Sequence, residues 1–95
     1  MSHIVAKLEH EPDNGDLLIT DQVEVAPRVE DAVNRIGSCT GDLFAVWSLP
    51  SHVTREQAAE YIDRFDPESV WIMSDDWPFE LADRYSKQVR SPGRG

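Results

Sequence analysis

Apolar and polar residues alternate along residues 3–10 and again along residues 17–25, the period-two pattern of half-buried strands. The turn between them contains Asn14 and Gly15, and both accept the positive φ angles that tight hairpin turns require. We therefore predict an N-terminal β-hairpin. Asp21 falls on the apolar face of the second strand, which predicts a bulge or a frayed edge there. The apolar positions are Ile4, Ala6 and Leu8 in the first strand and Leu17, Ile19, Val23 and Val25 in the second.

Two later stretches place apolar residues at helical spacing. The first begins near Pro27, which suits the first turn of a helix, and stops at Gly37, a common residue at a helix end. The second opens with Thr54 and Gln57, which match a capping box, and closes at Asp66-Pro67. The apolar stripes are Val29, Ala32, Val33 and Ile36 in the first helix and Ala58, Tyr61, Ile62 and Phe65 in the second.

Residues 43–49 and 70–73 are apolar on both faces, which is typical of central strands covered on both sides. Because a predicted helix separates them, a parallel pair with a right-handed crossover is favoured. A third helix is predicted to start at Ser74, Asp75 or Asp76, with Pro78 in its first turn. Its inner face would consist of Leu81, Ala82, Tyr85 and Val89.

The order of these elements, ββαβαβα, predicts one small α/β domain, with α+β as the alternative class. We expect a mixed four-stranded sheet that contains the N-terminal hairpin, together with three helices, over residues 1–89. Residues 90–95 have the composition of a disordered basic tail.

The chain is strongly acidic, with eighteen acidic against nine basic residues and a net charge of −9. All eighteen acids but only five bases lie in residues 1–83, and the other four bases lie in residues 84–95. Such a body repels phosphate, so we expect it to bind neither nucleic acid nor anionic membranes. The expected attraction is to basic protein surfaces. Solubility, or adaptation to a salt-rich source, explains the same acidity equally well.

Several other classes of protein lack support in the sequence. No stretch approaches the roughly 20 apolar residues of a membrane helix, and the first residues do not resemble a signal peptide, so we expect a cytoplasmic protein. Cys39 is the only cysteine, which excludes an internal disulfide. The chain has no glycine-rich phosphate loop, no nucleophile elbow and no zinc-ligand spacing. We therefore predict no cofactor, no metal and no enzymatic activity.

One candidate for chemistry follows from the predicted parallel strands, because ligands bind beyond the carboxyl ends of such strands. Ser51 and His52 follow the first strand, and Asp75 and Asp76 follow the second. If the ends are neighbours, His52 is placed to act as a base and the two aspartates to hold a hard cation. The same residues also suit ordinary helix starts, where hydroxyls and carboxylates cap free N–H groups.

Surface acids and one tryptophan form the favoured candidate site. On the second predicted helix, away from the apolar stripe, Glu56 and Glu60 lie four residues apart and repel each other, a cost that an acidic binding face requires. Trp77 follows two aspartates in a loop, where two roles fit it equally well: an anchor for an arginine-rich surface, or a side chain folded over the end of the sheet. The strand residues Trp47 and Trp71 are expected in the core. The predicted partner-binding residues are Glu56, Glu60, Asp63, Asp75, Asp76 and Trp77.

These observations favour a small acidic protein-binding module, an inhibitor or regulator that blocks a basic surface of a partner protein, with a surface that otherwise binds nucleic acid as one such target. Phage-encoded inhibitors of host defence, immunity proteins and nucleic-acid mimics share this size and charge, which is an analogy of class alone. The alternative is a small α/β enzyme or ligand-binding domain with its site at the ends of strands 43–49 and 70–74. We expect a monomer or a homodimer, the latter through an edge strand of the hairpin.

Overall fold

The N-terminal hairpin supplies two of the four long strands of the sheet. The computed structural model describes residues 2–11, 15–76, 79–80 and 89–90. In it, β1 (Ser2–His10) pairs antiparallel with β2 (Leu17–Ala26), which confirms the predicted hairpin. Gly15 has a φ of 76°, a left-handed conformation that glycine adopts without a steric cost. Asn14 lies outside the described residues.

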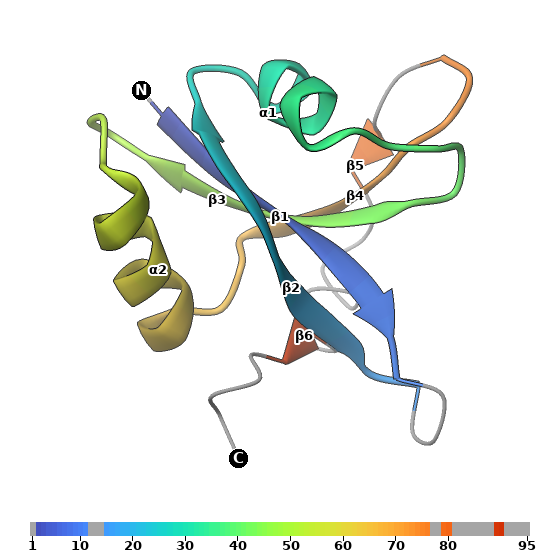
Figure 1. The fold of residues 1–95 in the computed structure, drawn as a ribbon, viewed down its shortest axis with the longest axis horizontal. Coiled ribbons are helices and arrows are strands. Elements are labelled where there is room, and N and C mark those ends of the chain that lie inside the picture. Colours follow the sequence, from blue (N-terminus) through green and yellow to red (C-terminus); the bar gives the residue numbers. More distant parts are fainter. Residues whose placement is uncertain (1, 12–14, 77–78, 81–88, 91–95) are drawn as a thin grey trace.

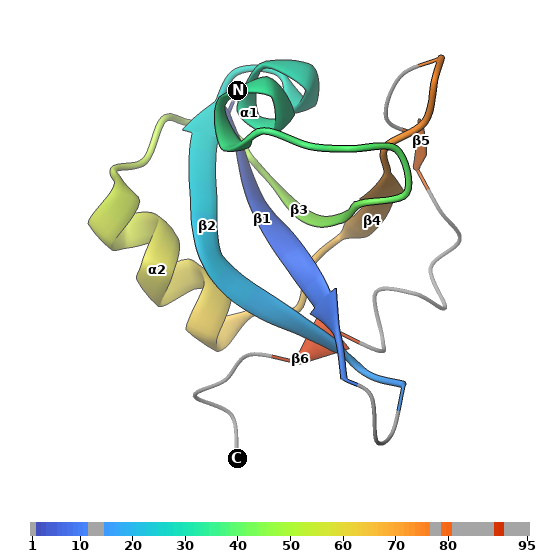
Figure 2. The same ribbon diagram turned by 45° about the vertical axis from the view of Figure 1, so that its right-hand side comes forward.

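A bulge interrupts the hairpin where Asp21 predicted one. Ala6 lies opposite Val23 and Leu8 lies opposite Ile19, so residues 20–22 of β2 share the single position opposite Lys7. The extra residues let β2 bend, and Figure 2 shows this strand curving as it passes in front of the sheet. In a regular strand Asp21 would lie on the apolar face between Ile19 and Val23, and at the bulge it is instead exposed.

The strands β3 (Leu43–Leu49) and β4 (Ser69–Ile72) continue the sheet on the other side of β1. Leu43 lies opposite Ile72 and Val46 lies opposite Ser69, so the pair is antiparallel and the predicted parallel crossover is wrong. The chain does not return to the start of β3: the N–H of Glu68 donates to the carbonyl of Val46, 2.9 Å away. An apolar pattern on both faces of a strand indicates that both faces are covered by other elements, but it does not indicate the direction of the strand.

Two short strands complete the edges of the sheet. β5 (Phe79–Glu80) pairs antiparallel with β4, and β6 (Val89–Arg90) pairs parallel with β2. The strand order is β5-β4-β3-β1-β2-β6, and the four long strands are antiparallel throughout (Figure 1).

The predicted third helix is not confirmed. Residues 79–80, near its predicted start, form β5, and Val89, the last residue of its predicted inner face, belongs to β6. The other residues of this predicted helix after Asp76, residues 77–78 and 81–88, lie outside the described residues. Arg90, the first residue of the predicted tail, belongs to β6, and residues 91–95 also lie outside the described residues.

The two predicted central helices are confirmed, and they lie on opposite faces of the sheet (Figures 1 and 2). α1 (Val29–Ile36) packs on one face, where Ala32 and Val33 join a buried cluster with Phe44. α2 (Arg55–Arg64) packs on the other face, where Ala58 and Ile62 join a larger one. That larger cluster contains Ile4, Ala6, Leu8, Leu17, Ile19, Ala45, Trp47, Leu49, Ala58, Ile62, Val70 and Val89.

The capping box of Thr54 and the helix end at Gly37 are also confirmed, whereas Pro27 precedes the N-cap residue Arg28 and so lies outside the first turn of α1. The hydroxyl of Thr54 accepts a hydrogen bond from the N–H of Gln57, and the side chain of Gln57 accepts one from the N–H of Thr54. Gly37 ends α1 with a φ of 85°. The result is a small, compact α+β domain with two helices and a sheet whose four long strands are antiparallel; α+β is the fold class predicted as the alternative.

Candidate functional site

The antiparallel pairing of β3 and β4 separates the residues of the predicted catalytic site. Ser51 and His52 follow the end of β3, whereas Asp75 and Asp76 follow β4 and lie next to the start of β3, where the hydroxyl of Thr40 contacts Asp75 at 3.3 Å. A strand of the seven residues of β3 spans roughly 20 Å at about 3.3 Å per residue. Direct proton transfer needs hydrogen-bond reach, so this arrangement does not form one site.

The predicted partner-binding residues fall into two groups. Glu56, Glu60 and Asp63 are exposed on α2. Asp75 and Asp76 are exposed in the segment after β4, on the opposite side of the molecule from α2 in both ribbon views (Figures 1 and 2). Trp77 lies outside the described residues. One flat partner surface can therefore contact either α2 or this segment, but not both. The shape of the surface beside each group distinguishes the two candidates.

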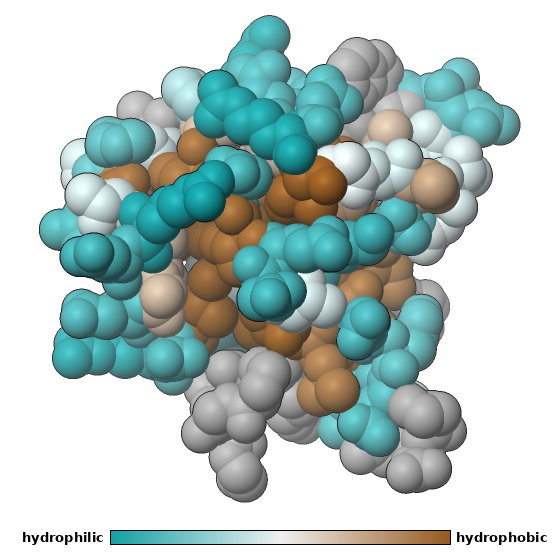
Figure 3. Space-filling model, in the orientation of Figure 1, coloured by the Kyte–Doolittle hydropathy of each residue, from teal (hydrophilic) through white to brown (hydrophobic). Residues whose placement is uncertain are grey.

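That feature is a groove between β2 and α2, with a volume of about 440 Å³. Figure 3 shows apolar side chains at its bottom, surrounded by hydrophilic side chains. A smaller hollow of about 320 Å³ near the start of α1 is lined by polar residues alone. The residues that line the groove are Ile19, Thr20, Asp21, Val23, Arg55, Ala59, Ile62 and Asp63.

The bulge of β2 and the small side chain of Ala59 account for the groove. Ile19 and Val23 lie on either side of the bulge and both face α2, where they pack on the cluster that contains Ile62. On the facing helix, Ala59 is exposed and adds only a methyl group, so α2 does not fill the space above them. The bottom of the groove is therefore apolar, although charged residues line its sides.

Charged side chains form the rim of the groove. Asp21 lies on the β2 side and Asp63 on the α2 side. Arg55 forms an ion pair with Glu24, whose side chain is 19% exposed whereas that of Arg55 is 72% exposed. Among these residues the carboxylates of Asp21, Glu24 and Asp63 outnumber the single guanidinium of Arg55, so acidic side chains predominate at the rim.

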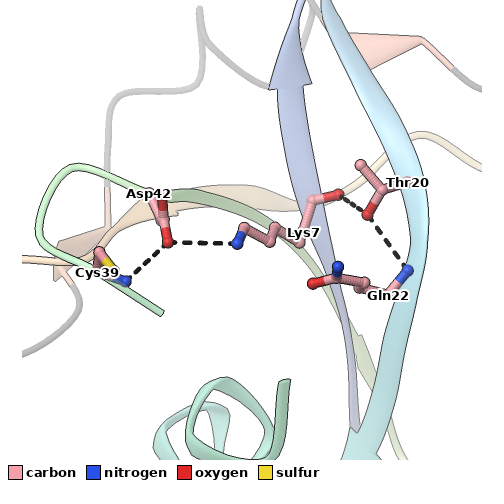
Figure 4. A network of polar contacts seen from close by, with 5 residues as sticks. All are labelled: Lys7, Thr20, Gln22, Cys39 and Asp42. Atoms are coloured by element: carbon pink, nitrogen blue, oxygen red, sulfur yellow. Dashed lines mark hydrogen bonds and ion pairs between the residues drawn. The ribbon is translucent and has the colours of Figure 1, made fainter. Parts of the chain in front are cut away.

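A hydrogen-bonded network holds the bulge next to this groove (Figure 4). The Thr20 hydroxyl donates to the carbonyl of Lys7 at 2.8 Å and accepts from the N–H of Gln22 at 3.2 Å. On the neighbouring strand β1, the Lys7 ammonium lies 3.4 Å from an oxygen of Asp42, and that oxygen also accepts a hydrogen bond from the N–H of Cys39 at 2.7 Å. The network thus ties the bulge to the segment before β3 and keeps the wall of the groove in place.

Two tryptophans and the cysteine were the other residues considered in the sequence. Trp47 is buried, as predicted, and Trp71 is half-buried against the cluster under α1. Cys39 is an exposed free thiol. Within the described residues, no group of three or more His, Cys, Asp or Glu is placed to hold a metal ion. No helix in the described part of the chain is long and apolar enough to cross a membrane.

Comparison with models of protein families, with curated proteins and with solved structures finds no match for this chain.

Sequence reasoning identified the acids of α2 and missed the groove beside them. Two signals pointed to it. Asp21 marked the bulge, and Ala59 is a small residue on the polar side of the second predicted helix. Neither signal shows that β2 and α2 lie side by side, because that placement follows from how residues 50–68 cross the sheet.

Proposed function

We propose that this protein is a small acidic protein-binding module, an inhibitor or regulator that covers a basic surface of a partner protein. Its contact face consists of the exposed acids of α2 and the groove between α2 and β2. One observation carries the proposal: the exposed acids Glu56, Glu60 and Asp63 lie on α2, the helix that forms one wall of an apolar groove, and Asp63 itself lines that groove. Surface charge by itself is also explained by solubility. An apolar groove beside charged residues, in contrast, offers a binding place for a partner side chain.

The two parts of this face have different physical roles. The carboxylates attract a basic partner from a distance and speed association, an effect that salt screens over about 10 Å at 0.1 M ionic strength. The groove buries apolar surface and slows dissociation. A partner surface that otherwise binds nucleic acid fits the first role, because it carries the positive charge that phosphate requires. Inhibition then follows from occupation of that surface.

The experiment is a capture of partners from a lysate of the source or its host, at low and at moderate salt, followed by titration of the purified partner. We expect basic partners whose affinity falls steeply with salt. Substitution of Glu56→Gln, Glu60→Gln and Asp63→Asn together should weaken binding by about tenfold or more.

A matched control removes the same number of charges elsewhere, with Asp31→Asn, Asp75→Asn and Asp76→Asn. These residues are exposed on α1 and after β4, away from the proposed face. Equal losses of affinity in the two triple variants would contradict a defined acidic face, and an affinity that does not change with salt would contradict the electrostatic mechanism.

A further inference from the structure

The outer edge of β2 is the feature that suggests how a partner binds. β6 pairs with this edge at Leu17 and Leu18, and in the described part of the chain β2 has no other strand partner on that side. We propose that the edge from Ile19 onward, together with the groove, accepts an extended basic segment of the partner protein as an added strand. This inference rests on the proposed function and states the form of the partner's contact.

The short pairing with β6 supports strand addition at this edge. A strand presents backbone N–H and C=O groups on both of its sides, and an edge that is not paired is a template for another chain. β6 already uses this edge in the parallel direction, and the groove begins at Ile19, the next residue along β2. The site therefore continues an interaction that the fold itself makes.

The groove specifies the side chains of the added segment. Alternate residues of a strand point to the same face, so every second side chain of the segment would enter the groove beside α2. Ile19, Val23 and Ile62 provide an apolar surface for a methylene chain, and Asp21 and Asp63 provide carboxylates at the rim. Lysine and arginine combine such a chain with a cationic end, so they are the side chains that fit.

Charge distinguishes a partner protein from a second copy of this chain. Pairing of two β2 edges would bring Asp21 and Glu24 of one copy close to the same residues of the other, between two molecules that each carry a net charge of −9. Like charges opposite each other on paired strands are destabilising. A basic segment meets no such repulsion, so the occupant is a partner.

A short peptide of alternating threonine and arginine tests the inference with the full chain. Its affinity and its binding site are measured by titration with detection of backbone amide shifts in NMR spectra. We expect the largest shifts at residues 19–23 and 59–63. Two further peptides carry the same side chains but are N-methylated either at every arginine or at every threonine, which removes the N–H groups from one edge or the other.

Strand addition in the parallel direction that β6 takes, which is the direction we expect, uses only one edge of the peptide. One methylated peptide should therefore bind about tenfold more weakly or worse, because the lost hydrogen bonds are not replaced, while the other keeps its affinity. Equal affinities of the two methylated peptides would overturn strand addition, since side-chain contacts alone would then account for binding.

Two protein variants test the position of the site. Asp21→Asn with Asp63→Asn removes the rim charges and should weaken peptide binding about fivefold to tenfold, while Asp75→Asn with Asp76→Asn removes the same charge elsewhere and should change it little. Ala59→Leu, at an exposed helix position, fills the groove and should abolish the shifts at residues 19–23. Unchanged binding by both groove variants would overturn the inference.

Two other occupants have recognisable outcomes. If residues 91–95 of the chain itself hold the groove, Arg94→Gln should raise peptide affinity about fivefold or more, because a competing cation is lost. If a second copy holds it, sedimentation should detect a dimer that Ala59→Leu dissociates. Either result overturns a partner as the occupant.

Failure of this inference and failure of the proposed function give different results. If the peptide ignores the groove variants but the captured partner still requires Glu56 and Glu60, the acidic face stands and strand addition falls. If the captured partner ignores both sets of acids, the proposed function falls as well.

Discussion

The indole of Trp47 is tied to the end of α2, because its Nε1–H donates a hydrogen bond to the carbonyl oxygen of Phe65 at 2.9 Å. Trp47 is buried within β3, whereas Phe65 ends the helix and is 51% exposed as a residue. The centroid of the Phe65 ring lies 4.5 Å from that of Tyr61. The bond satisfies a polar group that would otherwise be buried without a partner. It also fixes where the chain leaves α2 on its way to β4, and so fixes the helix that forms one wall of the groove.

Replacement of Trp47 by Phe should therefore destabilise the protein by about 2–4 kcal/mol, since it leaves a cavity and removes the hydrogen bond to Phe65. Denaturation by urea, followed by far-UV circular dichroism, measures the change. Trp71→Phe is the control, because Trp71 is half-buried and its Nε1–H donates at 2.9 Å to Ser69, only two residues away. A loss of stability for Trp71→Phe as large as for Trp47→Phe would contradict the importance of the bond to Phe65.

The hydroxyl of Thr20 is predicted to stabilise the bulge of β2. Thr20→Val keeps the shape of the side chain but leaves the Lys7 carbonyl and the Gln22 N–H without their hydrogen-bond partner, so we expect a loss of about 1–2 kcal/mol. Thr20→Ser retains the hydroxyl and should recover most of that loss. Chemical denaturation of the three proteins checks this expectation, and equal stabilities of the valine and serine variants would contradict it.

Local structure was predictable from the sequence because it depends on residues that are near one another in the chain. The hairpin, the bulge at Asp21, the helix end at Gly37 and the capping box at Thr54 each follow from a pattern of a few positions. The burial of Trp47 followed from an apolar run with the length of a strand.

The direction of β4 and the position of the groove were not predictable in the same way. A helix between two strands usually makes a parallel crossover, but here α2 crosses the sheet beside β2 and the chain returns opposite Val46. No periodicity in residues 50–68 encodes that path. The alternative enzyme or ligand site required parallel strands, so the antiparallel pair separates its residues. The acids of α2 required only that the helix forms, and they lie together on its surface.

The capping box of α2 offers a further test of a local contribution. Thr54→Ala removes the acceptor for the N–H of Gln57 and should cost about 1 kcal/mol of stability. It should also loosen the first turn of α2, which carries Arg55 at the rim of the groove. Ser51→Ala changes an exposed hydroxyl that precedes the helix, and it should stay within about 0.5 kcal/mol of the original stability. Equal effects of the two substitutions would show that the cap does not stabilise the helix.

The ion pair between Arg55 and Glu24 should contribute little to stability although it lies at the rim of the groove. Because the arginine side chain is 72% exposed, solvent screens the attraction, and a double-mutant cycle with Arg55→Gln and Glu24→Gln should give a coupling energy of at most about 1 kcal/mol. The coupling should fall further as salt is added. The pair of Lys7 and Asp42 has side chains that are 27% and 28% exposed, so the corresponding cycle should give the larger and less salt-sensitive value. A strong coupling between Arg55 and Glu24 that persists at high salt would contradict this order, and it would mean that the arginine is held in place as a fixed part of the groove wall.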